Sequence, residues 1–307
     1  MNKIEVKSGT SFFSSRFLRA VFDRRALHWA DADFLMREIA ERLASRLDYI
    51  KIQPRRLLDA GCSTGADLLT LGARYPQAYR IGLDLSEAMT NAAASKCCRT
   101  GWHMLQTTHG PGIIQGDFSK IPLRNSSVDL LWSNLALHWY QEPHRVIPEW
   151  HRVLTNNGLL MFSAFGPDTL RELRAAWKEV SAFPQLELMP TDMHDLGDML
   201  VQSHFDTPVV DMESITMTFE TPQALLRDVR LLGVNLQPML SVSLTGKQYY
   251  SSLLAALERQ RRADGTLMLT FEIIYGHAWK VASRTDATGN AVIRVQDIQR
   301  DGRRYHT

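Results

Sequence analysis

A short apolar strand, a turn bounded by glycines and the start of a helix follow one another at residues 56–71, and this unit constrains the fold most. The strand is Arg56–Ala60, Gly61 and Gly65 bound the turn, and an apolar helical pattern begins at Ala66. Glycines carry no side chain, so a ligand can approach the backbone N–H groups at the helix N-terminus closely. The unit therefore predicts an α/β protein with a nucleotide-type pocket at this turn.

The rest of the chain continues this alternation of strands and helices. Further strands are expected at residues 79–84, 112–117, 128–133 and 158–164, with helices at 31–47, after Ser86 and at 143–154. After Phe165 the pattern changes to helices at 169–180 and 222–232 and strands at 209–219 and 270–281. Short apolar strands alternating with helices are typical of a parallel sheet covered on both faces. We predict a doubly wound, mostly parallel sheet with helical lid insertions.

These elements divide the chain into four parts. We expect an N-terminal helical cap at residues 1–55, a ligand-binding core at 56–166, and lid insertions with the final strands at 167–284. A polar tail at 285–307 follows, in which Val292, Ile293 and Val295 could form a short edge strand.

Composition excludes several classes of protein. The formal charge of +2 comes from 35 basic and 33 acidic residues, which gives no global reason to expect nucleic-acid binding. No apolar run is long enough to span a bilayer. The three cysteines are too few for a disulfide framework and lack zinc-site spacing, so we expect no metal and a cytoplasmic location.

Carboxylates at the ends of the next two strands indicate which ligand the turn binds. The dinucleotide fingerprint fails, because Ser63 and Ala66 stand where its second and third glycines belong, and a pyrophosphate would fit poorly. S-adenosylmethionine has no phosphate and tolerates side chains in this loop. Asp84, at the end of the next strand, can accept from ribose hydroxyls. Asp117 can accept from the adenine amino group while Phe118 packs on the ring.

The run Leu-Asp-Ala-Gly-Cys-Ser-Thr-Gly at residues 58–65 resembles the first motif of the class I S-adenosylmethionine-dependent methyltransferases. The chain departs from that motif at Ser63, where the family usually has glycine. The resemblance implies a seven-stranded sheet of the Rossmann-like kind whose last strand is antiparallel. It also implies a cofactor site formed by Trp29, Asp59, Gly61, Cys62, Ser63, Thr64, Gly65, Asp84, Leu85, Asp117, Phe118, Asn134 and Leu135.

The segment Ser-Asn-Leu-Ala-Leu-His-Trp at residues 133–139 resembles a region of the malonyl-acyl carrier protein O-methyltransferases of biotin synthesis. Further likenesses to this family lie at residues 22–26, 169–177, 227–233 and 275–279, and Trp29 stands where the family usually has tyrosine. The resemblance implies methylation of the carboxylate of malonyl-acyl carrier protein or malonyl-CoA. Two alternatives stay open: a methyltransferase of another small acceptor such as a quinone precursor, and a complex I assembly factor with arginine hydroxylase activity.

A malonyl carboxylate is already ionised at neutral pH, so its methylation requires no general base but does require a cation to orient it. The candidates are Arg171 and Arg174 on one predicted helix and Arg227 and Arg230 on another, together with His138. For each arginine a surface ion pair is an equal alternative, and His138 could simply pack in the core.

The N-terminal region could bind an acidic carrier protein. Its basic residues are interleaved with aromatic residues, in the order Arg16, Phe17, Arg19, Phe22, Arg24 and Arg25. Such a pattern suits docking of acyl carrier protein, and it equally suits an amphipathic helix that packs its phenylalanines on the core.

Overall fold

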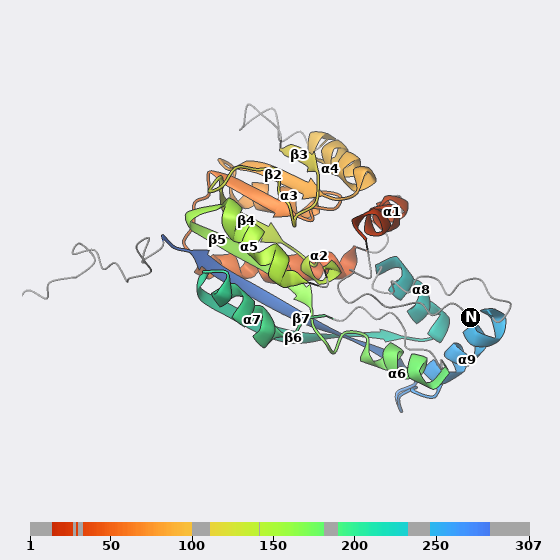
Figure 1. Ribbon diagram of the computed structural model, residues 1–307. Helices are drawn as coiled ribbons and strands as arrows, with labels where there is room; N and C mark the ends of the chain where they lie inside the picture. Colours follow the sequence, from red (N-terminus) through yellow and green to blue (C-terminus); the bar gives the residue numbers. More distant parts are fainter. Residues whose placement is uncertain are drawn as a thin grey trace, which may run out of the picture.

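The computed structural model describes residues 14–26, 29, 33–99, 111–140, 142–180, 190–232 and 246–282 (Figure 1). The helices are α1 (Ser15–Arg25), α2 (Phe34–Arg46), α3 (Ala66–Arg74), α4 (Glu87–Arg99), α5 (Pro143–Val153), α6 (Arg171–Val180), α7 (Met193–Gln202), α8 (Pro222–Leu232) and α9 (Gly246–Glu258), with short 3₁₀ turns η2 (Leu47–Tyr49) and η4 (Leu137–Trp139). The strands are β1 (Arg56–Ala60), β2 (Tyr79–Asp84), β3 (Gly112–Gln115), β4 (Val128–Ser133), β5 (Leu154–Phe165), β6 (Asp206–Phe219) and β7 (Leu267–Lys280).

All seven strands form one sheet in the order β3-β2-β1-β4-β5-β7-β6. The five strands from β3 to β5 are parallel neighbours, so their carboxyl ends meet at one edge. Strand β7 is antiparallel to both β5 and β6. The prediction of a seven-stranded, mostly parallel sheet whose last strand is antiparallel is confirmed. The chain order reverses between β1 and β4, and ligands of such sheets bind outside the carboxyl ends at this point.

Helices cover both faces of the sheet because each central strand is apolar on both sides. On one face, Leu43 of α2 and Leu68 of α3 are fully buried in the same cluster as residues of β1 and β5. On the other face, Trp150 of α5 and Leu200 of α7 are fully buried against β4, β5 and β7. The predicted N-terminal cap thus includes α2, which packs on the core.

Strands β6 and β7 are long and extend past the other strands as a two-stranded ribbon (Figure 1). The helices α6, α8 and α9 gather at one end of this ribbon (Figure 1). Their buried residues, among them Leu173, Val229 and Ala256, join the cluster that contains Phe219 and Leu267 of the ribbon. The two helices predicted after the core, at residues 169–180 and 222–232, therefore pack in one group together with α9.

Some helices and strands differ from those expected from the sequence. Helices α7 and α9 were not among the expected elements. Strand β5 begins at Leu154, earlier than expected, so the preceding helix α5 ends at Val153. The predicted tail at 285–307, including Val292, Ile293 and Val295, lies outside the described residues. No helix in the described ranges is long and apolar enough to cross a membrane.

Candidate active site

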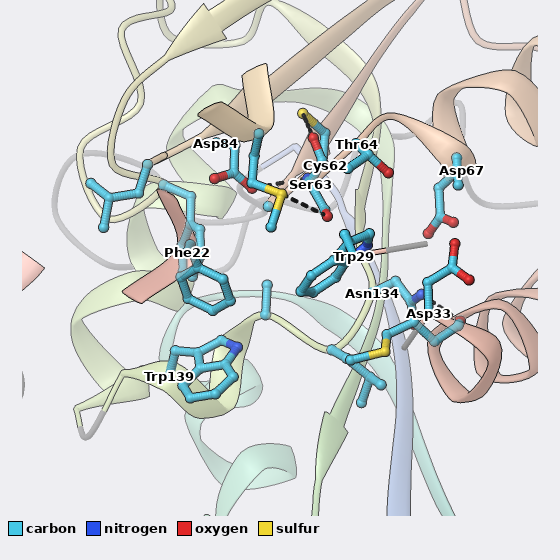
Figure 2. Close-up of a pocket in the computed structure, with 18 of the residues that line it drawn as sticks. Phe22, Trp29, Asp33, Cys62, Ser63, Thr64, Asp67, Asp84, Asn134 and Trp139 are labelled. Carbon is cyan, nitrogen blue, oxygen red and sulfur yellow. Dashed lines mark hydrogen bonds between the residues drawn. The ribbon is translucent and has the colours of Figure 1, made fainter. Parts of the chain in front are cut away.

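A pocket opens at the carboxyl edge of the sheet, where β1, β2, β3 and β4 end. Figure 2 shows that Phe22 and Trp139 lie on one side of it, Asp33, Asp67 and Asn134 lie on another, and Trp29 lies between. The lining residues are Leu18, Phe22, Trp29, Asp33, Met36, Arg37, Gly61, Cys62, Ser63, Thr64, Ala66, Asp67, Asp84, Leu85, Met89, Asp117, Phe118, Asn134, Leu135, Ala136, His138, Trp139, Tyr140, Phe165 and Leu232.

The floor of the pocket is the glycine-bounded turn between β1 and α3. Gly61 has φ +91° and Gly65 has φ +78°, a left-handed backbone that disfavours other residues. A Cβ placed on Gly61 would lie 2.6 Å from the Cβ of Ala136, so the two chain segments approach too closely for any side chain there. Ser63 also has a positive φ of 48°, and its N–H donates to Asp84 Oδ2 at 2.9 Å. The turn thereby presents backbone to the pocket.

Asp84 at the end of β2 is held by backbone N–H groups on both of its oxygens. Ser63 N donates to Oδ2 and Ser86 N donates to Oδ1, each at 2.9 Å. Burial raises the pKa of this carboxyl to about 6, although the two hydrogen bonds lower it. Each carboxylate oxygen has a second lone pair, so Asp84 can still accept from ligand hydroxyls.

Asp117, just after β3, is the centre of a second polar group. Its Oδ1 accepts from the hydroxyls of Ser119, at 2.6 Å, and Tyr140, while Oδ2 accepts from Ser15 Oγ at 3.1 Å. Burial raises the pKa of Asp117, but hydrogen bonds from Ser119 and Tyr140 outweigh it and the net pKa is lowered. Phe118 packs at 4.8 Å from the Tyr140 ring. Asp117 is thus ionised and fixed in place beside an aromatic wall.

The end of the pocket near α2 carries both signs of charge. Arg37 Nε lies 2.9 Å from Asp33 Oδ1, and Trp132 Nε1 donates to Asp67 Oδ2 at 2.8 Å. Burial raises the pKa of Asp67, while the Trp132 hydrogen bond lowers it. Asn134 is positioned by its amide N–H donating to the backbone carbonyl of Met36 at 3.0 Å. Two carboxylates and one guanidinium suit a ligand that itself carries an ammonium and a carboxylate.

Asp59 lies below the floor and does not line the pocket. Its side chain is buried, with the residue 1% exposed, and its Oδ2 has no hydrogen-bond partner among the described residues. Burial raises its pKa well above the usual range, and the charges of Asp67 and Asp84 raise it further. Gly65 also lies away from the lining, because it packs closely against Ala93 of α4.

The opposite end of the pocket is aromatic. The rings of Phe22 and Trp139 meet edge to face at 5.1 Å, and Trp29 lies 6.3 Å from Phe22. His138 packs 4.5 Å from the Phe165 ring, and Phe165 N donates to its Nδ1 at 3.5 Å. Burial lowers the pKa of His138 to about 3, so this imidazole is neutral.

Helix α1 closes one side of the pocket through contacts with two strand ends. The Ser86 hydroxyl donates to Asp23 Oδ1 at 2.5 Å, and Arg19 pairs with Glu87 at 3.0 Å. At its start, Ser15 donates to Asp117 as described above. The apolar face of α1, with Leu18, packs toward the pocket. The interpretation of this region as an amphipathic helix on the core is therefore correct for its apolar face.

Most residues predicted to bind the cofactor line this one pocket. Trp29, Gly61, Cys62, Ser63, Thr64, Asp84, Leu85, Asp117, Phe118, Asn134 and Leu135 all do so, whereas Asp59 and Gly65 support the floor from below. Sequence reasoning missed several lining residues: Leu18, Phe22, Asp33, Met36, Arg37, Ala66, Asp67, Met89, Ala136, Trp139, Tyr140, Phe165 and Leu232. The position of Asp67 in the first turn of α3 was the clearest available signal for one of them.

Of the residues predicted to be catalytic, only His138 lines the pocket. Arg171 is exposed and pairs with Glu172 at 3.1 Å, and Arg174 donates to the carbonyl of Pro167. Arg227 is exposed and pairs with Asp228 at 3.2 Å, and Arg230 is also exposed on α8. For Arg171, Arg227 and Arg230 the alternative interpretation, as residues of solvated faces, fits these positions better than carboxylate binding, whereas Arg174 is half-buried.

Comparison with known proteins places the chain in a family. A family model described as a methyltransferase domain matches residues 58–162. A putative methyltransferase of Bacillus halodurans C-125 has the same fold, with a TM-score of 0.55 at 16% identity over 78% of this chain and 99% of that one. A malonyl-[acyl-carrier protein] O-methyltransferase of Laribacter hongkongensis (strain HLHK9) is 41% identical over 268 residues, 87% of this chain and 90% of that protein.

A protein of the same name from Gallionella capsiferriformans (strain ES-2) is 41% identical over 279 residues, 91% of this chain and 95% of that protein. Both alignments extend over most of this chain and of the relative. The chain therefore belongs to the malonyl-acyl carrier protein O-methyltransferases, a family of class I S-adenosylmethionine-dependent methyltransferases.

Proposed function

We propose that the protein transfers a methyl group from S-adenosylmethionine to the free carboxylate of malonyl-acyl carrier protein. The product is the malonyl methyl ester that starts the pimeloyl branch of biotin synthesis. The observation that carries the proposal is a pocket with two different ends. Carboxylates that can accept from the hydroxyls and amino group of a nucleoside lie at one end, and aromatic side chains lie at the other. Relatives aligned along most of the chain are named for this activity.

The residues present fit the methyl donor. The close approach of Gly61 to Ala136 leaves bare backbone at the floor, and Asp84 and Asp117 can accept from the ribose and adenine. Asp33 and Arg37 offer opposite charges to the ammonium and carboxylate of the donor's amino-acid end. When bound, S-adenosylmethionine supplies an electrophilic methyl group on a positively charged sulfur.

The residues at the aromatic end fit an acceptor that needs no proton removed. A malonyl carboxylate has an unperturbed pKa of roughly 4 and is ionised at neutral pH. His138 is neutral, with a pKa of about 3, and its Nδ1 faces the Phe165 N–H, so it is no strong base. Phe22, Trp29 and Trp139 exclude water and orient the acceptor. The chain's contribution to the rate is then orientation and desolvation.

Donor affinity is expected to fall in acid. Asp84 has a pKa of about 6 in the donor-free protein, and ribose hydroxyls bind its ionised form more strongly than its protonated form. Above that pH the affinity is constant, and at about pH 5 the dissociation constant should be about tenfold higher than at about pH 7.5. Calorimetric titration at both pH values measures the change. The Asp84→Asn variant should bind the donor weakly, and its dissociation constant should depend less on pH. If that constant changes with pH as much as in the wild-type protein, a group other than Asp84 causes the effect.

Carrier protein should dock on the exposed face of α1. Arg16 and Arg24 are exposed there, whereas Arg19 is engaged with Glu87 and Arg25 is largely buried. Reversing both exposed charges, Arg16→Glu with Arg24→Glu, should raise KM for malonyl-acyl carrier protein about tenfold, because an acidic partner is then repelled. KM for malonyl-CoA should change much less.

The matched control for this charge reversal lies at the other edge of the sheet. Lys51 and Arg55 are exposed near the amino end of β1, far from the pocket edge. Lys51→Glu with Arg55→Glu changes the net charge by the same amount and should leave KM for the carrier near the wild-type value. Equal effects of the two double variants would rule out docking on α1.

Intact mass spectrometry tests the proposed reaction directly. The purified protein with S-adenosylmethionine should add one methyl group to malonyl-acyl carrier protein and none to acetyl-acyl carrier protein. Malonyl-CoA, assayed in parallel, shows whether the carrier protein is required. Malonyl carrier that stays unmodified by a folded preparation that binds the donor would overturn the proposal. Complementation of a biotin-requiring strain is an independent check.

A further inference from the structure

The two ends of the pocket differ in charge. Four carboxylates line the part of the pocket assigned to the positively charged donor: Asp33, Asp67, Asp84 and Asp117. The aromatic end, around Phe22 and Trp139, contributes no carboxylate among the described lining residues. An anionic acceptor is repelled by the first end and is free to enter the second. Burying a carboxylate there requires a cationic partner, because an unpaired buried charge is strongly unfavourable.

Arg25 is the basic residue that adjoins this aromatic end. It is the last residue of α1, and its guanidinium carbon lies 5.6 Å from the centroid of the Phe22 ring, which lines the pocket. Its Nη1 is buried and has no hydrogen-bond partner among the residues that the structure describes. Burial lowers the pKa of this guanidinium to about 10, with a smaller contribution from the charge of Arg24.

A buried guanidinium with an unmade hydrogen bond is unfavourable in the protein alone and becomes favourable once an anion pairs with it. Arginine suits a carboxylate acceptor because its planar fork can hold one edge of the group and leave a lone pair free. Arg25 adjoins the pocket through Phe22 rather than lining it, and the arginine that does line the pocket, Arg37, is already paired with Asp33 at the donor end. The other arginines considered for this role, such as Arg171 and Arg227, are exposed and paired elsewhere.

We propose that Arg25 binds the malonyl carboxylate of the acceptor and sets the specificity of the enzyme for an acyl group that ends in a carboxylate. This inference rests on the proposed function and adds the residue that recognises the substrate. It also reassigns Arg25 from carrier docking, where its burial makes it ineffective, to recognition of the acyl group.

Binding to a complex that cannot react tests the assignment without measuring turnover. The enzyme is saturated with S-adenosylhomocysteine, and the dissociation constants of malonyl- and acetyl-acyl carrier protein are measured by calorimetry. The wild-type protein should bind the malonyl form about 10- to 100-fold more tightly, as a charge-assisted pair predicts. Arg25→Gln should reduce this ratio to near one. Arg25→Lys, which keeps the charge but loses the fork, should give an intermediate ratio.

Arg24→Gln is the matched control on the same helix. Because Arg24 is exposed, its loss should weaken both carrier forms equally and leave the malonyl-to-acetyl ratio unchanged. Unchanged affinity for S-adenosylhomocysteine shows that each variant is folded, and Arg25→Lys decides the matter if Arg25→Gln does not fold. If both Arg25 variants keep the malonyl-to-acetyl affinity ratio of the wild-type protein, the inference about Arg25 is overturned but the proposed function is not. A wild-type protein that neither prefers nor methylates the malonyl carrier would overturn the proposed function instead.

Discussion

Replacing Asp84 with alanine should abolish measurable donor binding at micromolar protein concentrations. The carboxylate sits at the end of β2 with both oxygens fixed by backbone N–H groups, so it is preorganised for two ribose hydroxyls. Two charge-assisted hydrogen bonds lost together should raise the dissociation constant by about 100- to 1000-fold. The loss includes the turn itself, because the Ser63 N–H no longer has its acceptor. Calorimetric titration with S-adenosylhomocysteine measures the change.

Two further variants separate binding from folding. Asp84→Asn keeps one acceptor oxygen and should bind the donor more tightly than Asp84→Ala, though well below wild type. Asp198→Ala removes an exposed carboxylate on α7, away from the pocket, and should leave donor affinity unchanged. Donor affinity within twofold of wild type in a folded Asp84→Ala protein would refute the assignment of this pocket to the nucleoside, and with it the proposed chemistry.

Gly61→Ala should both destabilise the protein and block the pocket floor. Alanine at φ +91° is strained, and its methyl group would lie 2.6 Å from the Cβ of Ala136, which has no freedom to rotate away. Backbone strain and overpacking together should lower the free energy of unfolding by about 2–4 kcal/mol. Thermal unfolding should then occur about 3–6 °C lower, with donor affinity reduced in the fraction that remains folded.

Gly265 provides the control for this substitution. It has φ +80°, nearly the same backbone conformation, and a Cβ there would meet no atom within 4 Å. Gly265→Ala should therefore lower the free energy of unfolding only through backbone strain, by about 1–2 kcal/mol. Adding Ala136→Gly to Gly61→Ala removes the close contact between the two methyl groups. The double variant should therefore regain the stability that Gly61→Ala loses beyond the backbone strain. Equal destabilisation by the two single substitutions would mean that close approach at the pocket floor contributes nothing.

The elements of the core were predictable because they depend on local pattern. The strands β1, β2 and β4 and the turn after β1 were expected at residues that the structure confirms. A helix was expected after Ser86, and at the start of that helix Met89 N donates to the Ser86 hydroxyl at 3.1 Å. Strand ends are therefore good guides to a site in a parallel sheet, because their carboxyl ends share one edge.

The acceptor residues were not predictable by the same reasoning. Helical spacing correctly put Arg171 and Arg174 within one helix, but periodicity does not show what lies opposite that helix. Arg25 lies beside Phe22, and the Phe22 ring meets Trp139, a residue from a distant part of the chain. The residues at the donor end also come from separate segments, because Asp33 precedes α2 and Asp67 lies on α3. Their meeting in one pocket was therefore not predictable from local pattern.

The sequence by itself determined the strand–turn–helix unit, the alternation that builds the sheet and the carboxylates at its edge. Those features follow from backbone conformation, periodicity and the common direction of parallel strands, all of which neighbouring residues specify. Only the tertiary structure decided that α1 covers the pocket and that the ribbon of β6 and β7 carries the lid helices. It also decided that Arg25 has a buried, unpaired Nη1 while Arg171, Arg227 and Arg230 are exposed. Such outcomes depend on which surfaces pack together, because burial and pairing of charges arise between segments that no local pattern connects.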